Sequence, residues 1–292
     1  MNGVLTIIAG TGARVEDDDI ASACAALAEG ASVGAARWLT PGRACEIAFA
    51  GDAAVRRMVA ARLADRPLDL AVVPAAGRQK RVLVADMEST VIENEMIDEI
   101  ATLAGLDHAR IAAITARTMA GEIDFAAALR ERVALFAGLS ATVLDAAAAR
   151  IRPMPGAEAL VRTMNAAGAL TVLVSGGFTC FARPVAARLG FARVHANRLG
   201  IADGRLTGTV HAPLIDRAAK RRILEETAAE RGLDAAETLA VGDGANDLDM
   251  LAAAGLGVGF RPKPVVAEAA GAVIRHAGLE AVLYLQGMAP AA

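Results

Sequence analysis

The sequence is poor in cysteine and in aromatic residues. Its 292 residues include three cysteines, one tryptophan and one tyrosine. Cys24, Cys45 and Cys180 lie far apart and form no C-x-x-C pair, which excludes a disulfide framework and a zinc site, so we interpret all three as buried thiols. A net charge of −3 with few aromatic residues provides neither a basic stripe nor stacking platforms for a nucleic acid. We therefore expect a small-molecule partner.

Long apolar runs are also missing. A membrane span needs ~20 mainly apolar residues, and the best candidate, 133–149, is interrupted by Ser140, Thr142 and Asp145 and favours an amphipathic helix instead. The first residues lack the basic region of a secretory signal and soon become acidic. The sequence predicts a cytoplasmic protein with no membrane partner.

The first 75 residues alternate short β-type runs with two helical runs. The expected strands are 4–8, 36–40, 45–49 and 68–73, and the expected helices are 19–28 and 53–63. Pro41-Gly42 is typical of a turn and makes the middle strands a hairpin. The resulting βαββαβ order predicts a ferredoxin-like unit.

A polar and basic segment, 75–81, is interpreted as a solvated linker, after which the pattern changes. The runs 81–86, 170–175 and 238–243 are apolar almost throughout, and each is followed by a helical pattern. Such runs are typical of parallel strands covered on both faces. Ligands of such sheets bind at the carboxyl ends of the strands.

Polar motifs follow each of these three strands. They are Asp86-Met87-Glu88-Ser89-Thr90, Ser175-Gly176-Gly177 and Gly242-Asp243-Gly244-Ala245-Asn246-Asp247. Each motif alone has an ordinary structural explanation, such as a helix cap or a turn. At one edge of one sheet, however, converging carboxylates require a cation, and oxygen-rich loops suit Mg²⁺. Lys220, which is expected to begin a helix, could neutralise phosphate oxygens there.

The order of these motifs resembles the haloacid dehalogenase superfamily of phosphotransferases and, within it, the phosphoserine phosphatase family. Further segments support the resemblance, which covers about residues 81–285: 95–101, 121–125, 129–133 and 196–199. It implies an α/β fold with a Rossmann-like parallel sheet and a helical cap inserted after the first strand, at about 91–155. The implied domains are an ACT-like N-terminal domain, 1–75, and a phosphatase domain, 76–292.

The resemblance also implies the roles of individual residues. Asp86 is the expected nucleophile, Glu88 the expected acid and base, and Lys220 a catalytic cation. Mg²⁺ would be held by Asp86, the Glu88 carbonyl, Asp243 and Asp247. The expected substrate, O-phospho-L-serine, would be bound by residues of the core and the cap, namely Glu95, Met119, Phe125, Arg132, Ser175, Gly176, Lys220 and Asn246. The reaction implied is hydrolysis through an aspartyl phosphate, the last step of serine biosynthesis.

One residue departs from the family pattern. The second acid of the first motif is normally Asp, whereas this chain has Glu88. A glutamate keeps a carboxyl group of similar acidity, but its extra methylene displaces that group, and ~1 Å displacements can be costly. We predict retained hydrolase activity with an altered rate or specificity.

Two other functions remain open from the sequence. One is a phosphotransferase that passes the phosphoryl group to another hydroxyl, and the other is an amino-acid-sensing regulatory protein whose phosphatase site is weakened by Glu88. The sequence retains Asp86, Lys220, Asp243 and Asp247, which argues against a site that has lost its activity. A homodimer is a further expectation.

Overall fold

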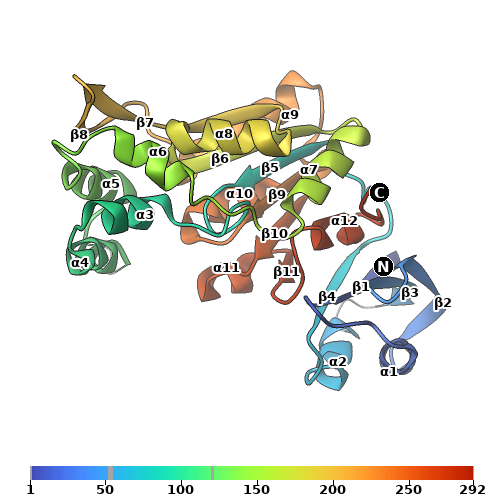
Figure 1. Cartoon of the computed structure of the whole chain (residues 1–292). Helices are drawn as coiled ribbons and strands as arrows, with labels where there is room; N and C mark the ends of the chain where they lie inside the picture. The colour runs from blue at the N-terminus through green and yellow to red at the C-terminus, as the bar shows by residue number, and fades with distance from the viewer. Residues whose placement is uncertain (1, 52–54, 120–121, 292) are drawn as a thin grey trace.

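The fold contains two separate β-sheets joined by one connecting segment (Figure 1). The computed structural model describes residues 2–51, 55–119 and 122–291, without the side chains of residues 2, 55, 56 and 119. The smaller sheet is built from the first 74 residues and the larger one from the rest of the chain. The α/β class and the parallel-rich sheet predicted from the sequence are confirmed.

The small sheet has four antiparallel strands in the order β2-β3-β1-β4. Its elements are β1 (Asn2–Ala9), α1 (Asp17–Ala28), β2 (Ala31–Thr40), β3 (Ala44–Gly51), α2 (Val55–Arg62) and β4 (Leu68–Pro74). The βαββαβ order agrees with the sequence prediction, although β2 begins five residues earlier. Apolar side chains of β1, β3 and α1, among them Leu5, Ile47 and Leu27, form a core of their own.

The large sheet has seven strands in the order β11-β10-β9-β5-β6-β7-β8, and every neighbouring pair except β7 and β8 is parallel. Its strands are β5 (Val82–Asp86), β6 (Leu170–Phe178), β7 (Arg193–Ala202), β8 (Arg205–His211), β9 (Thr238–Gly242), β10 (Leu256–Phe260) and β11 (Ala272–Ile274). The strands are accompanied by helices α7 (Ala157–Ala166), α8 (Thr179–Leu189), α9 (Arg217–Glu230), α10 (Leu248–Ala253), α11 (Pro264–Ala269) and α12 (Ala281–Leu285), the last of which follows β11. Two short 3₁₀ turns lie at Ala235–Glu237 and Ala245–Asp247. Val82, Val84 and Val174 on one face, and Leu83, Ala85 and Leu173 on the other, bury both faces of the central strands.

Among the described residues, five helices lie between β5 and β6. The first four, which precede α7, form an insertion: α3 (Met96–Ala104), α4 (His108–Met119), α5 (Phe125–Ala134) and α6 (Thr142–Ala148). Helices α3, α4 and α5 lie at one end of the large sheet, far from the small sheet (Figure 1). The two segments that lead into and out of the insertion pair with each other, since Met154 N–H donates to the Val91 carbonyl (2.9 Å) and Glu93 N–H donates to the Arg152 carbonyl (2.9 Å).

The single amphipathic helix predicted at 133–149 is wrong. α5 ends at Ala134, and α6 begins only at Thr142. Between them Gly138 adopts a positive φ of 81°, a left-handed conformation that ends helices, and its N–H donates to the Leu206 carbonyl on β8 instead.

The two sheets dock through a buried carboxylate. Asp69 on β4 accepts the backbone N–H groups of Arg275, His276 and Ala277, three consecutive residues after β11, at 2.7, 3.0 and 2.8 Å. The segment predicted as a solvated linker also contributes, because Arg78 is only partly exposed and donates to the Glu46 carboxylate at 2.8 Å. Residues 75–77, 79 and 81 are exposed as predicted, and only Arg78 and Lys80 are partly buried. Arg78 departs from the prediction because its partner Glu46 belongs to the small sheet, which is distant in sequence.

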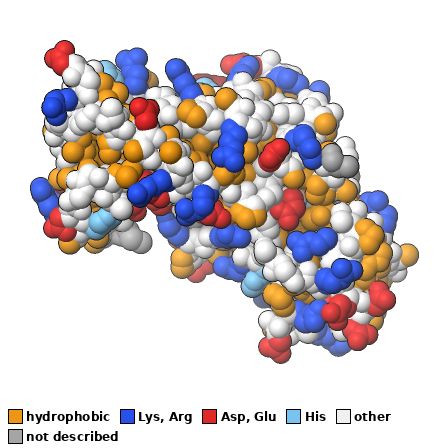
Figure 2. Space-filling model, viewed as in Figure 1, with side chains coloured by type: hydrophobic (Ala, Val, Ile, Leu, Met, Phe, Trp, Pro, Cys, Tyr) orange, Lys and Arg blue, Asp and Glu red, His pale blue; other side chains and the backbone are white. Residues whose placement is uncertain are grey.

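Three further findings concern the cysteines, the length of the helices and the surface charge. Cys45 is buried as predicted, whereas Cys24 and Cys180 are partly exposed because they pack at the edges of their clusters. Among the residues that the structure describes, no helix combines the length and the apolarity that a membrane crossing requires. On the face seen in Figure 2, basic and acidic side chains are interspersed.

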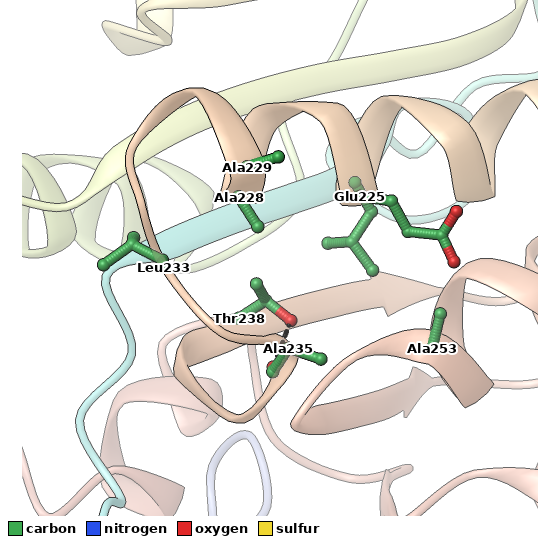
Figure 3. A pocket seen from close by; sticks show the side chains of 8 residues that line it. Glu225, Ala228, Ala229, Leu233, Ala235, Thr238 and Ala253 are labelled. Atoms are coloured by element: carbon green, nitrogen blue, oxygen red, sulfur yellow. Dashed lines mark hydrogen bonds between the residues drawn. The ribbon is translucent and has the colours of Figure 1, made fainter.

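A small cavity of about 150 Å³ lies between α9 and α10 and is lined chiefly by aliphatic residues such as Leu224, Ala228 and Leu233 (Figure 3). Its polar side chains are Glu225 and Thr238, and the Thr238 hydroxyl is already engaged, donating to the Ala235 carbonyl at 2.7 Å. The acidic residues predicted at the strand ends are absent from its lining.

Candidate active site

The three polar motifs meet at one edge of the large sheet. β5 lies between β6 and β9, with Asp86 in register with Val174 and Ala85 in register with Val241. Since these strands are parallel, the loops that follow them emerge side by side. This brings the first motif next to Ser175 on one side and Asp243 on the other.

Lys220 lies at the centre of the site. Its side chain is fully buried, and its Nζ lies 2.6 Å from Asp86 Oδ1 and 2.7 Å from Asp247 Oδ1. The helix was expected to begin at Lys220, but α9 begins at Arg217, where the Asp216 carboxylate caps it by accepting the Ala219 N–H. Lys220 therefore occupies the first turn of α9 and extends inward from it.

The acidic residues outnumber this single ammonium group. Ligand oxygens of Asp86, Asp243 and Asp247 lie within 4.8 Å of one another, and all three side chains are buried. Burial and the charge of Asp247 raise the pKa of Asp86 well above its ordinary value despite Lys220, and burial also raises that of Asp243. Burial alone would lower the pKa of Lys220, but the Asp247 and Asp86 charges raise it.

This cluster fits a divalent cation. Its oxygens are hard donors and they converge within one small volume, where burial and the neighbouring Asp247 charge raise the pKa values of Asp86 and Asp243. A bound cation would supply the missing positive charge.

Neighbouring residues hold the acidic cluster in place. The buried Thr90 hydroxyl donates to Asp243 Oδ1 in a long contact of 3.4 Å, and Gly244 N–H donates to Asp247 Oδ2 at 3.0 Å. Lys263 donates its backbone N–H to the Asp243 carbonyl, while its exposed ammonium group lies 3.5 Å from the Asp243 carboxylate. The Asn246 amide oxygen lies beside the Cα of Gly244, so Asn246 is at the same edge.

The motif at 175–177 is not the loop that the sequence suggested, because β6 continues through it to Phe178. A shift in register against β7 occurs between Ser175 and Phe178, so the two glycines form a bulge at the strand end. The Ser175 hydroxyl accepts the Gly177 N–H at 2.8 Å. A Cβ at position 176 would approach the Phe125 ring to 3.0 Å, which places Phe125 of the inserted helices directly against this bulge.

Glu88 lies between the sheet and the inserted helices. Its Oε1 accepts the N–H of Met96, the first residue of α3, at 3.0 Å. Burial of the carboxyl group and the nearby Glu95 charge raise the pKa of Glu88 to about 7, and the Met96 N–H and the more distant charges of Lys220 and Arg132 oppose that shift. A group with this pKa can both donate and accept a proton near neutral pH.

The residues expected to hold the amino acid part of a substrate lie nearby. Glu95 is exposed and accepts a hydrogen bond from the Ser89 hydroxyl at 2.7 Å. Arg132 on α5 is partly buried, which lowers its pKa, and is near enough to feel the charges of Glu88 and Glu95. The side chain of Met119 lies outside the described residues.

Sequence reasoning assigned no role to two residues that shape this site. Asn197 is buried, donates to the Gly176 carbonyl and accepts the Ile215 N–H, both at 2.8 Å, and thereby ties the bulge to the segment before α9. Thr90 lies behind Asp243. Both belong to segments that carried the family resemblance, but only the fold shows what they contact.

Comparisons with known proteins identify the family. The model of the haloacid dehalogenase-like hydrolases matches residues 83–252, and the chain belongs to this family. The phosphoserine phosphatase of Streptomyces coelicolor is 46% identical over 237 residues, which cover 80% of this chain and 57% of that protein. The phosphoserine phosphatase of Archaeoglobus fulgidus is 42% identical over 240 residues, covering 80% of this chain and 70% of that one.

A solved structure extends the likeness to the small sheet. The crystal structure of a probable phosphoserine phosphatase from Vibrio cholerae, in unliganded form, has a TM-score of 0.82 at 31% identity and covers 98% of this chain and 86% of its own. The chain spans little more than half the length of the Streptomyces relative.

Proposed function

We propose that this protein hydrolyses O-phospho-L-serine to L-serine and phosphate. The observation that carries the proposal is the buried Asp86, which ends the central strand β5 and lies 2.6 Å from Lys220 within a cluster of three carboxylates. Relatives named phosphoserine phosphatase that are 42% to 46% identical support the choice of substrate.

In the first step a carboxylate oxygen of Asp86 attacks the phosphorus. A bond from Asp86 to phosphorus forms as the bond from phosphorus to the serine oxygen breaks, and Glu88 gives its proton to the departing oxygen. Lys220, the Ser175 hydroxyl and the Gly176 N–H offset the charge on the phosphoryl oxygens. The product of this step is free serine and an aspartyl phosphate.

In the second step water attacks the aspartyl phosphate. Glu88, now deprotonated, takes a proton from the water as the new bond to phosphorus forms and the bond to Asp86 breaks. Phosphate leaves, and both carboxyl groups return to their starting states. The pKa of about 7 suits Glu88 to both steps, because both of its forms are populated at neutral pH.

A divalent cation, which we propose to be Mg²⁺, would be held by Asp86, Asp243 and the Glu88 carbonyl, with Asp247 orienting its water ligands. When bound, it supplies the positive charge that keeps Asp86 ionised and offsets the phosphoryl group. The cluster of carboxylate oxygens within 4.8 Å supports this assignment.

The inserted helices would recognise the amino acid. We assign the substrate ammonium group to Glu95, its carboxylate to Arg132 and its apolar surroundings to Met119 and Phe125, with Asn246 near the phosphoryl group. The opposite charges of Glu95 and Arg132 match the two charges of an amino acid. The ammonium group of serine would replace the Ser89 hydroxyl or share Glu95 with it.

We further propose that residues 1–75 form an ACT-like domain, that 76–292 form the phosphatase domain, and that about 91–155 act as a cap that excludes water during the first step. The pairing of the two connecting segments, Val91 with Met154 and Glu93 with Arg152, supports a common hinge for that cap. The cytoplasmic location, the role in serine biosynthesis and a homodimer stay predictions.

The test is phosphate release from O-phospho-L-serine by the purified full chain with Mg²⁺, before and after addition of EDTA. We expect release that stops with EDTA and resumes when excess Mg²⁺ is restored. Release that depends on an added alcohol acceptor would instead indicate a phosphotransferase. Absence of release under all conditions would favour the regulatory protein and contradict the proposal.

A further inference from the structure

Gly177 faces the carboxyl group of Glu88. A Cβ built at position 177 would lie 3.0 Å from Oε1, 3.0 Å from Oε2 and 3.1 Å from Cδ of Glu88, and these are its three nearest neighbours. Because these three distances are nearly equal, a Cβ at position 177 would face the carboxyl group as a whole rather than a single oxygen. A methyl group there would be closer to Glu88 than ordinary van der Waals contact allows.

The opposite constraint on Glu88 comes from the inserted helices. Oε1 is held by the N–H of Met96, which as the first residue of α3 has no partner within its own helix. Glu88 is thus confined between a bulge of the sheet and a helix terminus, and it cannot move away from position 177 without straining or losing this bond.

The backbone of Gly177 does not itself require glycine. Its φ lies outside the left-handed region, and its N–H is already engaged with the Ser175 hydroxyl at 2.8 Å. The backbone conformation therefore permits an alanine at 177, and the obstacle to its methyl group is the carboxyl group of Glu88. Gly176 differs, because a Cβ there would meet the Phe125 ring.

We propose that Gly177 is a positioning residue matched to Glu88: it leaves the space that lets the longer side chain place its carboxyl group for proton transfer. The proposal rests on the acid–base role given to Glu88 above. An aspartate at 88 would withdraw the carboxyl group by about one carbon–carbon bond, so it would not need this space. Gly177 belongs to the Ser-Gly-Gly motif that resembles the family pattern, in which the second acid is normally Asp, so Glu88 fills space that this pattern already leaves open.

The test is a double-mutant cycle of Gly177→Ala and Glu88→Asp, measured as kcat and KM for phosphate release from O-phospho-L-serine with Mg²⁺. Displacement of Glu88 by a few tenths of an ångström predicts a roughly 10- to 50-fold lower kcat for Gly177→Ala, with KM changed less than about threefold. In the Glu88→Asp background the same substitution should change kcat less than about threefold, because the pair no longer clashes.

Gly176→Ala, with and without Glu88→Asp, is the matched control. Its added methyl group meets Phe125 rather than Glu88, so its effect should be the same in both backgrounds. Equal losses from Gly177→Ala with Glu88 and with Asp at position 88 would overturn the proposal.

Thermal unfolding of the same proteins separates this proposal from the proposed function. Gly177→Ala should lower the unfolding temperature more in the Glu88 protein than in Glu88→Asp, whether or not the substrate is correct. A parent protein without phosphatase activity would contradict the proposed function, whereas equal shifts in unfolding temperature would contradict the pairing of Gly177 with Glu88.

Discussion

Asp69 of the small sheet and Asp86 of the large sheet are both buried carboxylates on β-strands, yet their surroundings differ. Asp69 accepts three consecutive backbone N–H groups at 2.7 to 3.0 Å and thereby joins the two sheets. Asp86 shares one ammonium group with Asp247, and Asp243 adds a third carboxylate nearby.

The difference separates a structural carboxylate from a reactive one. Donors surround Asp69, so its charge is matched by groups that are always present. Around Asp86 carboxylates outnumber ammonium groups, and burial together with the Asp247 charge raises the pKa of its carboxyl group despite Lys220. Such an excess of carboxylates is expected where a site binds a cation, and the substitutions below are chosen to expose it.

The largest expected effect on activity is that of Asp86→Asn. Without the nucleophile, phosphate release should fall by more than about 10⁴-fold. The free energy of unfolding should not fall, because the substitution removes one charge from a crowded set. Steady-state phosphate release and urea unfolding measure the two effects. Substantial activity in this variant would contradict the assignment of Asp86.

The next effect is that of Lys220→Met. The change leaves the buried Asp86 and Asp247 without their shared ammonium group, and the loss of one partner of a buried ion pair costs ~3–5 kcal/mol. We expect this loss in urea unfolding without divalent ions and a partial recovery when Mg²⁺ is added. A stability equal to that of the parent protein would mean that Lys220 does not offset the cluster.

Asp69→Asn should affect stability but not chemistry. An asparagine presents N–H₂ to backbone donors, so we expect a loss of ~1.5–3 kcal/mol in the free energy of unfolding, typical of hydrogen bonds to a charged group. The kcat should stay within about twofold of the parent value. A large loss of kcat with unchanged stability would contradict the assignment of Asp69 as a structural carboxylate.

The smallest effect is expected from Thr90→Val. It removes the 3.4 Å contact to Asp243 while keeping the shape of the side chain, and should cost about 1 kcal/mol of stability. The Mg²⁺ concentration for half-maximal activity should rise by a few-fold, since outer contacts tune metal affinity. An unchanged Mg²⁺ dependence would show that Thr90 has no influence on Asp243.

Much of the fold could be predicted from the sequence, because apolar runs and turn residues are local signals. The strand ends that carry Asp86, Ser175 and Asp243 follow from continuous apolar segments, and their convergence follows from parallel pairing. What failed depended on distant partners. Nothing local shows that Lys220 is buried, since its environment consists of carboxylates 134 and 27 residues away.

Three other features also depend on partners that are distant in sequence. Asp69 looks like an ordinary polar residue of a half-exposed strand, and the N–H groups that it binds lie more than 200 residues further along the chain. The predicted helix at 133–149 is interrupted between Ala134 and Thr142, where the Gly138 N–H pairs with β8. The clash that makes Gly177 a partner of Glu88 also exists only in three dimensions.

The most direct test of the central claim is a search for phosphate bound covalently to Asp86. Glu88→Gln lacks both the acid of the first step and the base of the second, so it is mixed with Mg²⁺ and a phosphate monoester whose leaving group needs no proton, such as p-nitrophenyl phosphate. Quenching with acid should yield a peptide that contains Asp86 and carries one added phosphoryl group, detected by mass spectrometry. The same treatment of Asp86→Asn should yield none. Phosphate release by the parent protein, with no phosphoryl group on Asp86 in either the parent or Glu88→Gln, would contradict the account.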